Sequence, residues 1–149
     1  MNVRRILLVE DNMNDVELTL AALEEHRMSN QVDVVRDGVE AIDYLYKRGA
    51  YSDCLHTLPA VILLDLKMPK MDGLEVLRRV KNDLELKNIP IVMLTSSREE
   101  QDVVESYKLG VNAYVVKPVA FEDFVAVVKQ LGLFWVLINE PPPDAPPRS

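Results

Sequence analysis

Acidic residues directly follow two apolar runs of strand length, and they are the residues of this chain best suited to carry chemistry. The run 61–64 leads into Asp65, and the run 6–9 leads into Glu10 and Asp11. Both runs are continuously apolar, which is typical of strands that are buried on both faces of a parallel sheet. Open α/β sheets place their functional groups at the carboxyl ends of such strands. We therefore expect the three carboxylates to share one pocket.

Two further apolar runs also end in polar groups. The run 89–94 is followed by Thr95, and the run 113–116 is followed by Lys117. If all four strands are parallel, a hydroxyl and an ammonium lie at the rim of the acidic pocket. Three carboxylates that close together cannot all stay ionised without help. A hard divalent cation with oxygen ligands, such as Mg²⁺, would compensate them. The alternative for Glu10 and Asp11 is helix capping, because acids at a helix N-terminus are favoured in any case.

The remaining pattern alternates strand and helix five times, which predicts an α/β fold with a doubly wound, five-stranded parallel sheet and five helices. The expected strands are about 5–9, 31–35, 60–64, 91–95 and 113–116. The expected helices are about 15–27, 38–47, 74–82, 99–108 and 121–139, the last one extended. Residues 49–59 are expected to form a long loop. In the third helix, the inward face is predicted to hold Val76, Leu77, Val80 and Leu84.

Composition limits the classes of function. The chain has 149 residues, a net charge of −7 and a single cysteine, Cys54. An acidic chain of this length, with no room for a helix-turn-helix unit, argues against nucleic-acid binding. One cysteine suits a reducing cytoplasm. The apolar stretch 131–138 is far shorter than the ~20 residues of a membrane span. We expect a cytoplasmic protein without nucleic-acid or membrane partners.

We expect two regions in the chain. Residues 1–139 have the length and the hydrophobic content of one domain. Residues 140–149 contain five prolines, so they should form an extended, flexible tail.

The ordered set Glu10-Asp11, Asp65, Thr95 and Lys117-Pro118 resembles the receiver domain of two-component response regulators, over about residues 3–133. The resemblance implies a flavodoxin-like receiver fold. It also implies a phosphorylation-controlled switch that is not an enzyme and that takes its phosphoryl group from a histidine kinase. Within that family the chain is most similar to single-domain regulators that pair with phytochrome-type histidine kinases. That similarity rests on residues 9–12, 37–41, 44–46, the loop near 49–59, and Phe134-Trp135.

The resemblance also assigns the residues that bind the phosphoryl group and the metal. Asp65 is expected to be the phosphoacceptor. Mg²⁺ is expected to be held by Glu10, Asp11, Asp65 and the backbone carbonyl of Lys67. Lys117 is expected to pair with a phosphate oxygen, after which a cis bond leads into Pro118. The Lys67 side chain either shields the acyl phosphate from water or is an ordinary solvated loop lysine.

Two further residues are expected to transmit the signal. Thr95 would donate its hydroxyl to the phosphoryl group, and the ring of Tyr114 would turn inward into the space that Thr95 vacates. This movement would change the face formed by the fourth helix, the fifth strand and the last helix. The alternative for Tyr114 is a half-buried strand tyrosine with no switching role.

The last predicted helix carries more apolar residues than one buried stripe requires. Phe124, Val128, Leu131 and Trp135 supply the stripe, which leaves over Val127, Phe134, Leu137 and Ile138. Leftover apolar surface normally marks an interface, unless it folds back onto its own domain. Aromatic residues are also favoured in interface cores. We expect a homodimer through Phe134, Trp135 and Ile138.

Other protein classes fit the sequence less well. A phosphohydrolase of the haloacid dehalogenase type requires a second aspartate two residues after the first, where Lys67 stands. A nucleotide-binding protein of similar architecture requires a Gly-rich loop after the first strand, where residues 10–14 stand. A degenerate receiver that serves only as a scaffold would lack some of the pocket residues, and all five are present.

Overall fold

Strands and helices alternate along the chain in the computed structural model, which describes residues 5–24, 32–53, 58–66, 68, 70–96, 98–106 and 110–132. The strands are β1 (Ile6–Val9), β2 (Val32–Val35), β3 (Val61–Asp65), β4 (Ile91–Thr95) and β5 (Ala113–Val116). The helices are α1 (Met13–Glu24), α2 (Gly38–Tyr46), α3 (Gly73–Lys81), α4 (Arg98–Ser106) and α5 (Phe121–Gln130). A short 3₁₀ helix, η2 (Gly49–Tyr51), lies within the predicted long loop.

The five strands form one parallel sheet in the order β2-β1-β3-β4-β5, which confirms the predicted doubly wound architecture. From β1 the chain passes to the edge at β2 and then crosses to the other side of β1 to form β3. The connections that follow β1 and β3 therefore leave the sheet in opposite directions. Such a switch point opens a crevice at the carboxyl ends of the strands, which is where open α/β sheets bind ligands.

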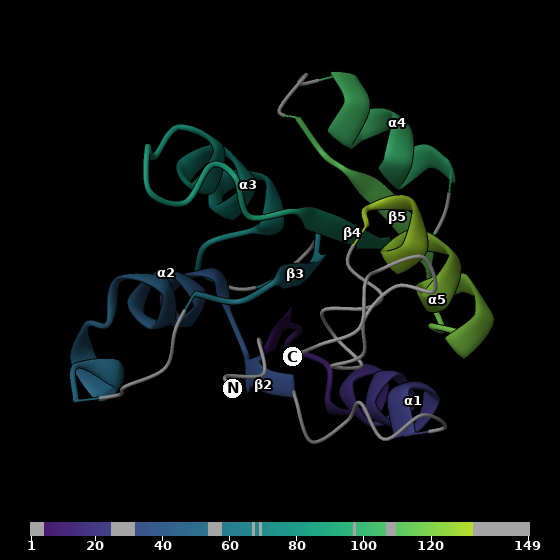
Figure 1. Ribbon diagram of the computed structural model, residues 1–149, viewed down its shortest axis with the longest axis horizontal. Coiled ribbons are helices and arrows are strands. Elements are labelled where there is room, and N and C mark those ends of the chain that lie inside the picture. The colour runs from purple at the N-terminus through teal and green to yellow at the C-terminus, as the bar shows by residue number, and fades with distance from the viewer. Residues whose placement is uncertain are drawn as a thin grey trace, which may run out of the picture.

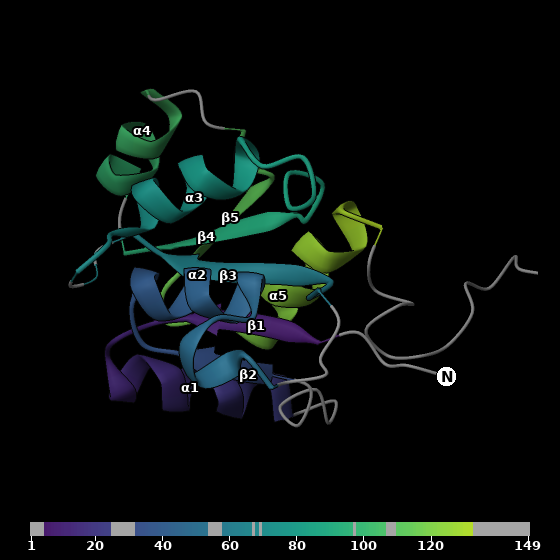
Figure 2. The same cartoon turned by 90° about the vertical axis from the view of Figure 1, so that its left-hand side faces the viewer.

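Both faces of the sheet are covered by helices, which explains why the strand sequences are continuously apolar. Leu7 and Val9 of β1 pack in one core with residues of α2, α3 and α4, whereas Ile6 and Leu8 pack in a second core with residues of α1 and α5. Figure 1 shows α1 and α5 together on one side of the sheet, and Figure 2 shows the same layers from the side. Each large apolar side chain buried in this way contributes about 1.5–3 kcal/mol to folding.

The start of α3 lies directly against the carboxyl end of β3. The Asp72 side chain caps the helix by accepting a hydrogen bond from the Glu75 N–H at 3.0 Å. The Gly73 N–H donates to the Leu66 carbonyl at 2.8 Å. A Cβ at Gly73 would lie only 2.3 Å from the carbonyl oxygen of Asp65, so only glycine permits this approach. The helix thereby fixes the backbone that carries Asp65.

Two predictions about burial are wrong. Leu84 is 81% exposed because α3 ends at Lys81 and a turn follows, and Leu86 enters the core in its place. Val127, which the stripe analysis left over, is buried in the core beneath α5. The apolar stripe of α5 is therefore wider than the pattern suggested.

The boundaries of two elements also differ from the prediction. β3 includes Asp65 itself, although the predicted strand stopped one residue earlier. α5 ends at Gln130, and Gly132 has a φ of +73°, a left-handed conformation that interrupts a helix. The prediction of one unbroken helix over residues 121–139 is therefore wrong. Residues 133–139 lie outside the described part of the chain.

None of the helices within the described ranges is long and apolar enough to cross a membrane.

Candidate functional site

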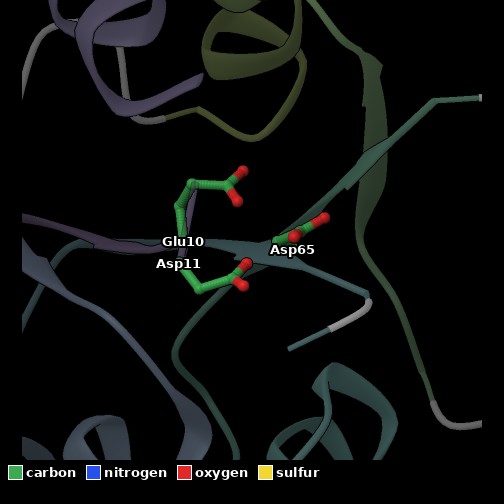
Figure 3. A group of neighbouring side chains, drawn as sticks. All are labelled: Glu10, Asp11 and Asp65. Atoms are coloured by element: carbon green, nitrogen blue, oxygen red, sulfur yellow. The ribbon is translucent and has the colours of Figure 1, made fainter. Parts of the chain in front are cut away.

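Three carboxylates gather at the carboxyl ends of β1 and β3. One oxygen of each of Glu10, Asp11 and Asp65 lies within 4.8 Å of the other two. Figure 3 shows the Glu10 and Asp11 side chains leaving adjacent backbone positions, with the Asp65 carboxylate beside them. Glu10 is 1% exposed and Asp65 5% exposed, whereas Asp11 lies at the surface. The three residues that the sequence predicted to share a pocket therefore do so.

Strand register produces this cluster. Val9 of β1 pairs with Leu64 of β3, so Glu10 and Asp65 each follow one of two directly paired residues. The Glu10 N–H donates to the Val35 carbonyl at 3.0 Å, which holds the backbone against β2. Because neighbouring strands lie about 4.8 Å apart, residues at equal register are within reach of one metal ion.

Lys117 contacts the acidic cluster from the end of β5. Its Nζ lies 3.1 Å from Oε1 of Glu10, 3.1 Å from Oδ2 of Asp15 and 3.1 Å from Oδ1 of Asp65. The Lys117 side chain is only 15% exposed. The peptide bond between Lys117 and Pro118 is cis, as the resemblance implied.

The electrostatics of the pocket are those of crowded and partly compensated charges. Burial and then the nearby Asp65 charge raise the pKa of Glu10, while the Asn12 N–H and Lys117 oppose them, and the net result is a pKa of about 7. For Lys117, burial alone would lower the pKa. The hydrogen bond to Asp65 and the charges of Asp65 and Glu10 outweigh burial, so the net direction is upward. The lysine therefore stays charged while Glu10 titrates close to neutrality.

The donor set of the cluster fits a hard divalent cation. Carboxylate oxygens are the ligands that Mg²⁺ prefers, and Mg²⁺ commonly binds through one or two carboxylates together with water and phosphate oxygens. The three carboxylates carry more negative charge than the single Lys117 ammonium can neutralise, so a cation would be favoured here.

Thr95 and Tyr114 occupy the same face of neighbouring strands. Thr95 ends β4, is fully buried and directly follows Leu94, the register partner of Asp65. Tyr114 pairs with Met93, which lies two residues before Thr95. The ring is half-buried and packs against the core that α2, α3 and α4 cover. Both residues therefore lie on one face of the sheet, and their switching roles stay predictions.

Sequence reasoning overlooked one charged residue of the site. Asp15, in the first turn of α1, contacts Lys117 and so belongs to the pocket. An acidic residue in the first turn of a helix is already explained by its favourable interaction with the helix dipole, so the sequence gives no reason to assign it a second role.

Several predicted residues lie outside the described part of the chain. These residues are Lys67, Phe134, Trp135 and Ile138.

The Glu10 pKa predicts a pH dependence of folding in metal-free buffer. A carboxyl group whose pKa is higher in the folded state stabilises the fold below its unfolded pKa, here 4.5, and that stability is lost as the pH rises through about 7. The free energy of unfolding should therefore fall between pH 4.5 and pH 8, by at most about 3 kcal/mol. Denaturant unfolding in a chelator, compared with Glu10→Gln, measures the effect. Parallel pH profiles for the two proteins would contradict it.

The comparisons with known proteins agree with this geometry. A family model described as "Response regulator receiver domain" matches residues 6–129. The probable methanogenesis regulatory protein FilR2 of Methanothrix harundinacea is 39% identical over 94% of this chain and 88% of its own length. The response regulator Rcp1 of Synechocystis is 40% identical over 88% of each chain.

Solved structures extend the likeness to the fold and the metal. The bacteriophytochrome response regulator RtBRR is 59% identical, with a TM-score of 0.85 over 95% of this chain and 86% of its own. Rcp1 in an Mn²⁺-bound form has a TM-score of 0.69 at 39% identity, over 89% of this chain and 94% of its own. An acidic pocket that binds a divalent metal is a property of receiver domains. The chain belongs to the response regulator receiver family, the phosphorylation-controlled switches of two-component signalling.

Proposed function

We propose that Asp65 accepts the phosphoryl group that a histidine kinase donates. The observation that supports this most is the position of the Asp65 carboxylate, beside two further carboxylates and 3.1 Å from an ammonium. In the transfer, one Asp65 oxygen attacks phosphorus and forms an O–P bond. The P–N bond of the phosphohistidine breaks, and its electron pair stays with the imidazole ring.

In this proposal Glu10, Asp11, Asp65 and the carbonyl of Lys67 hold Mg²⁺, which offsets the charge of the phosphoryl oxygens when it is bound. Lys117 donates a charge-assisted hydrogen bond to one of those oxygens. Its low exposure and its three carboxylate contacts keep it close to where the group would attach.

Phosphorylation would then reach the surface of α4, β5 and α5. Thr95 donates its hydroxyl to the phosphoryl group, and the Tyr114 ring turns inward behind it. Val103 of α4 is 45% exposed and Val116 of β5 is 49% exposed, so this face already offers apolar contact area. We propose that a homodimer forms here and that Phe134, Trp135 and Ile138 extend the contact.

The name of one similar protein suggests the partner. RtBRR is a bacteriophytochrome response regulator, and we extend this pairing to a phytochrome-type histidine kinase for the present chain. The protein would act in the cytoplasm as a binding switch rather than as an enzyme, without nucleic-acid or membrane partners. Residues 1–139 would form the receiver, and residues 140–149 a flexible tail.

Acetyl phosphate with Mg²⁺ should add one phosphoryl group to the wild-type protein, as measured by intact mass. Asp65→Asn removes the nucleophile and should abolish the added mass, as should chelation of the metal. Asp53→Asn is the matched control, because Asp53 is exposed and does not belong to the acidic cluster. Full labelling of Asp65→Asn would rule out Asp65 as the acceptor.

Millimolar Mg²⁺ alone should raise the melting temperature, because a cation that binds only the folded state stabilises it. At ten times the dissociation constant, the gain is about 1.4 kcal/mol, or roughly 4 °C. Asp11→Ala should weaken this response, whereas Glu17→Ala, which removes an exposed acid from α1, should not. An equal Mg²⁺ response in Asp11→Ala would exclude Asp11 from the metal site.

The proposed dimer predicts a sedimentation coefficient above that of a monomer at tens of micromolar protein. Phe134→Glu with Ile138→Glu should restore the monomer, because two charges would be buried at the contact. Leu84→Glu, at an exposed apolar site after α3, is the control. A monomeric wild-type protein, with and without beryllofluoride, would contradict the proposed interface.

A further inference from the structure

Asp15 differs from the other two partners of Lys117. The lysine ammonium has three N–H donors, and three carboxylates lie 3.1 Å from it: those of Glu10, Asp15 and Asp65. Glu10 and Asp65 also belong to the cluster of oxygen donors that fits a cation, whereas Asp15 does not. A cation and a phosphoryl group therefore compete with Lys117 for two of its three partners and leave the third one free.

Asp15 is anchored by the first turn of α1. The Asp15 N–H donates to Oδ1 of Asn12 at 3.0 Å, and the Val16 N–H donates to the Asn12 carbonyl at 3.0 Å. Val16 is buried in the core that α1 and α5 cover, so the turn cannot shift freely. The Asp15–Lys117 contact thereby ties the start of α1 to the end of β5, 102 residues away.

We propose that Asp15 is a positioning residue for the phosphoryl transfer. It holds the Lys117 ammonium at the mouth of the pocket while the other two partners are exchanged for metal and phosphoryl oxygens. This inference rests on the proposed acceptor role of Asp65 and names a residue that acts through Lys117.

Two opposing effects of the Asp15 charge must be weighed. It repels an incoming phosphoryl group, and it restrains a lysine side chain that would otherwise sample many rotamers. The Asp15 side chain is 27% exposed, against 1% for Glu10 and 7% for Asp65, so water screens its charge more effectively. The direct contact with Lys117 is short and partly shielded, since the lysine is only 15% exposed. Restraint should therefore outweigh repulsion.

The test measures the rate at which acetyl phosphate and Mg²⁺ label Asp65, by intact mass against time. In this reaction an Asp65 oxygen attacks phosphorus, and acetate leaves with the electron pair of the broken P–O bond. Asp15→Asn keeps the size of the side chain and removes the charge, and it should slow labelling by about three- to tenfold. Glu17→Gln removes the same charge from an exposed position of the same helix and should leave the rate unchanged.

A second pair of variants separates positioning from a structural role. If Asp15 acts through Lys117, then Asp15→Asn should have no further effect in a Lys117→Ala background. The same cycle, read from melting temperatures in a chelator, should also be non-additive, because the contact exists without metal. An additive result in the rate cycle, whatever the melting cycle shows, or an Asp15→Asn rate equal to or above wild type, would overturn the inference.

The outcome for the wild-type protein separates this inference from the proposed function. If wild type is labelled at Asp65 and Asp15→Asn is labelled equally fast, only the role of Asp15 is wrong. If wild type is not labelled at all, the acceptor assignment fails and the role of Asp15 fails with it.

Discussion

Repulsion among three carboxylates at the ends of β1 and β3 is the constraint on which the rest of the site depends. Two like charges 4 Å apart repel by about 4 kcal/mol at an effective dielectric constant of 20. The metal-free protein relieves this repulsion in two ways: through the Lys117 ammonium and through a Glu10 pKa of about 7. A cation relieves it in a third way. Because these solutions compete for the same oxygens, the pocket responds to both metal and phosphoryl groups.

The sheet makes such a pocket possible because it holds the charged groups without relying on their own contacts. β1 and β3 are fully buried, and apolar side chains on both faces set their register. The close approach of Gly73 to the Asp65 carbonyl adds a backbone restraint on the side where the chain leaves β3. Stability therefore comes from the cores, while the site keeps unfavourable charge density for its function.

The same sheet links the pocket to a distant surface. Thr95 is a buried neighbour of the Asp65 strand, and Tyr114 lies on the same sheet face one strand further along. A displacement at the end of β3 can therefore be passed to β4 and then to β5, because each of these strands pairs directly with the next. In the proposed switch, Val116 of β5 and Val103 of the neighbouring α4 offer exposed apolar surface on this side of the molecule. The coupling needs a rigid sheet, because only packed strands transmit small displacements.

The sequence by itself determined the alternating α/β order, the parallel sheet and the gathering of Glu10, Asp11 and Asp65, because buried parallel strands have a distinctive apolar pattern and end at one edge. Local patterns could not decide whether Leu84 and Val127 are buried, since burial depends on where a helix ends and on what lies opposite. Asp15 escaped notice for a related reason. Its partner Lys117 stands 102 residues away, and only the packing of α1 beside the end of β5 brings the two charges together.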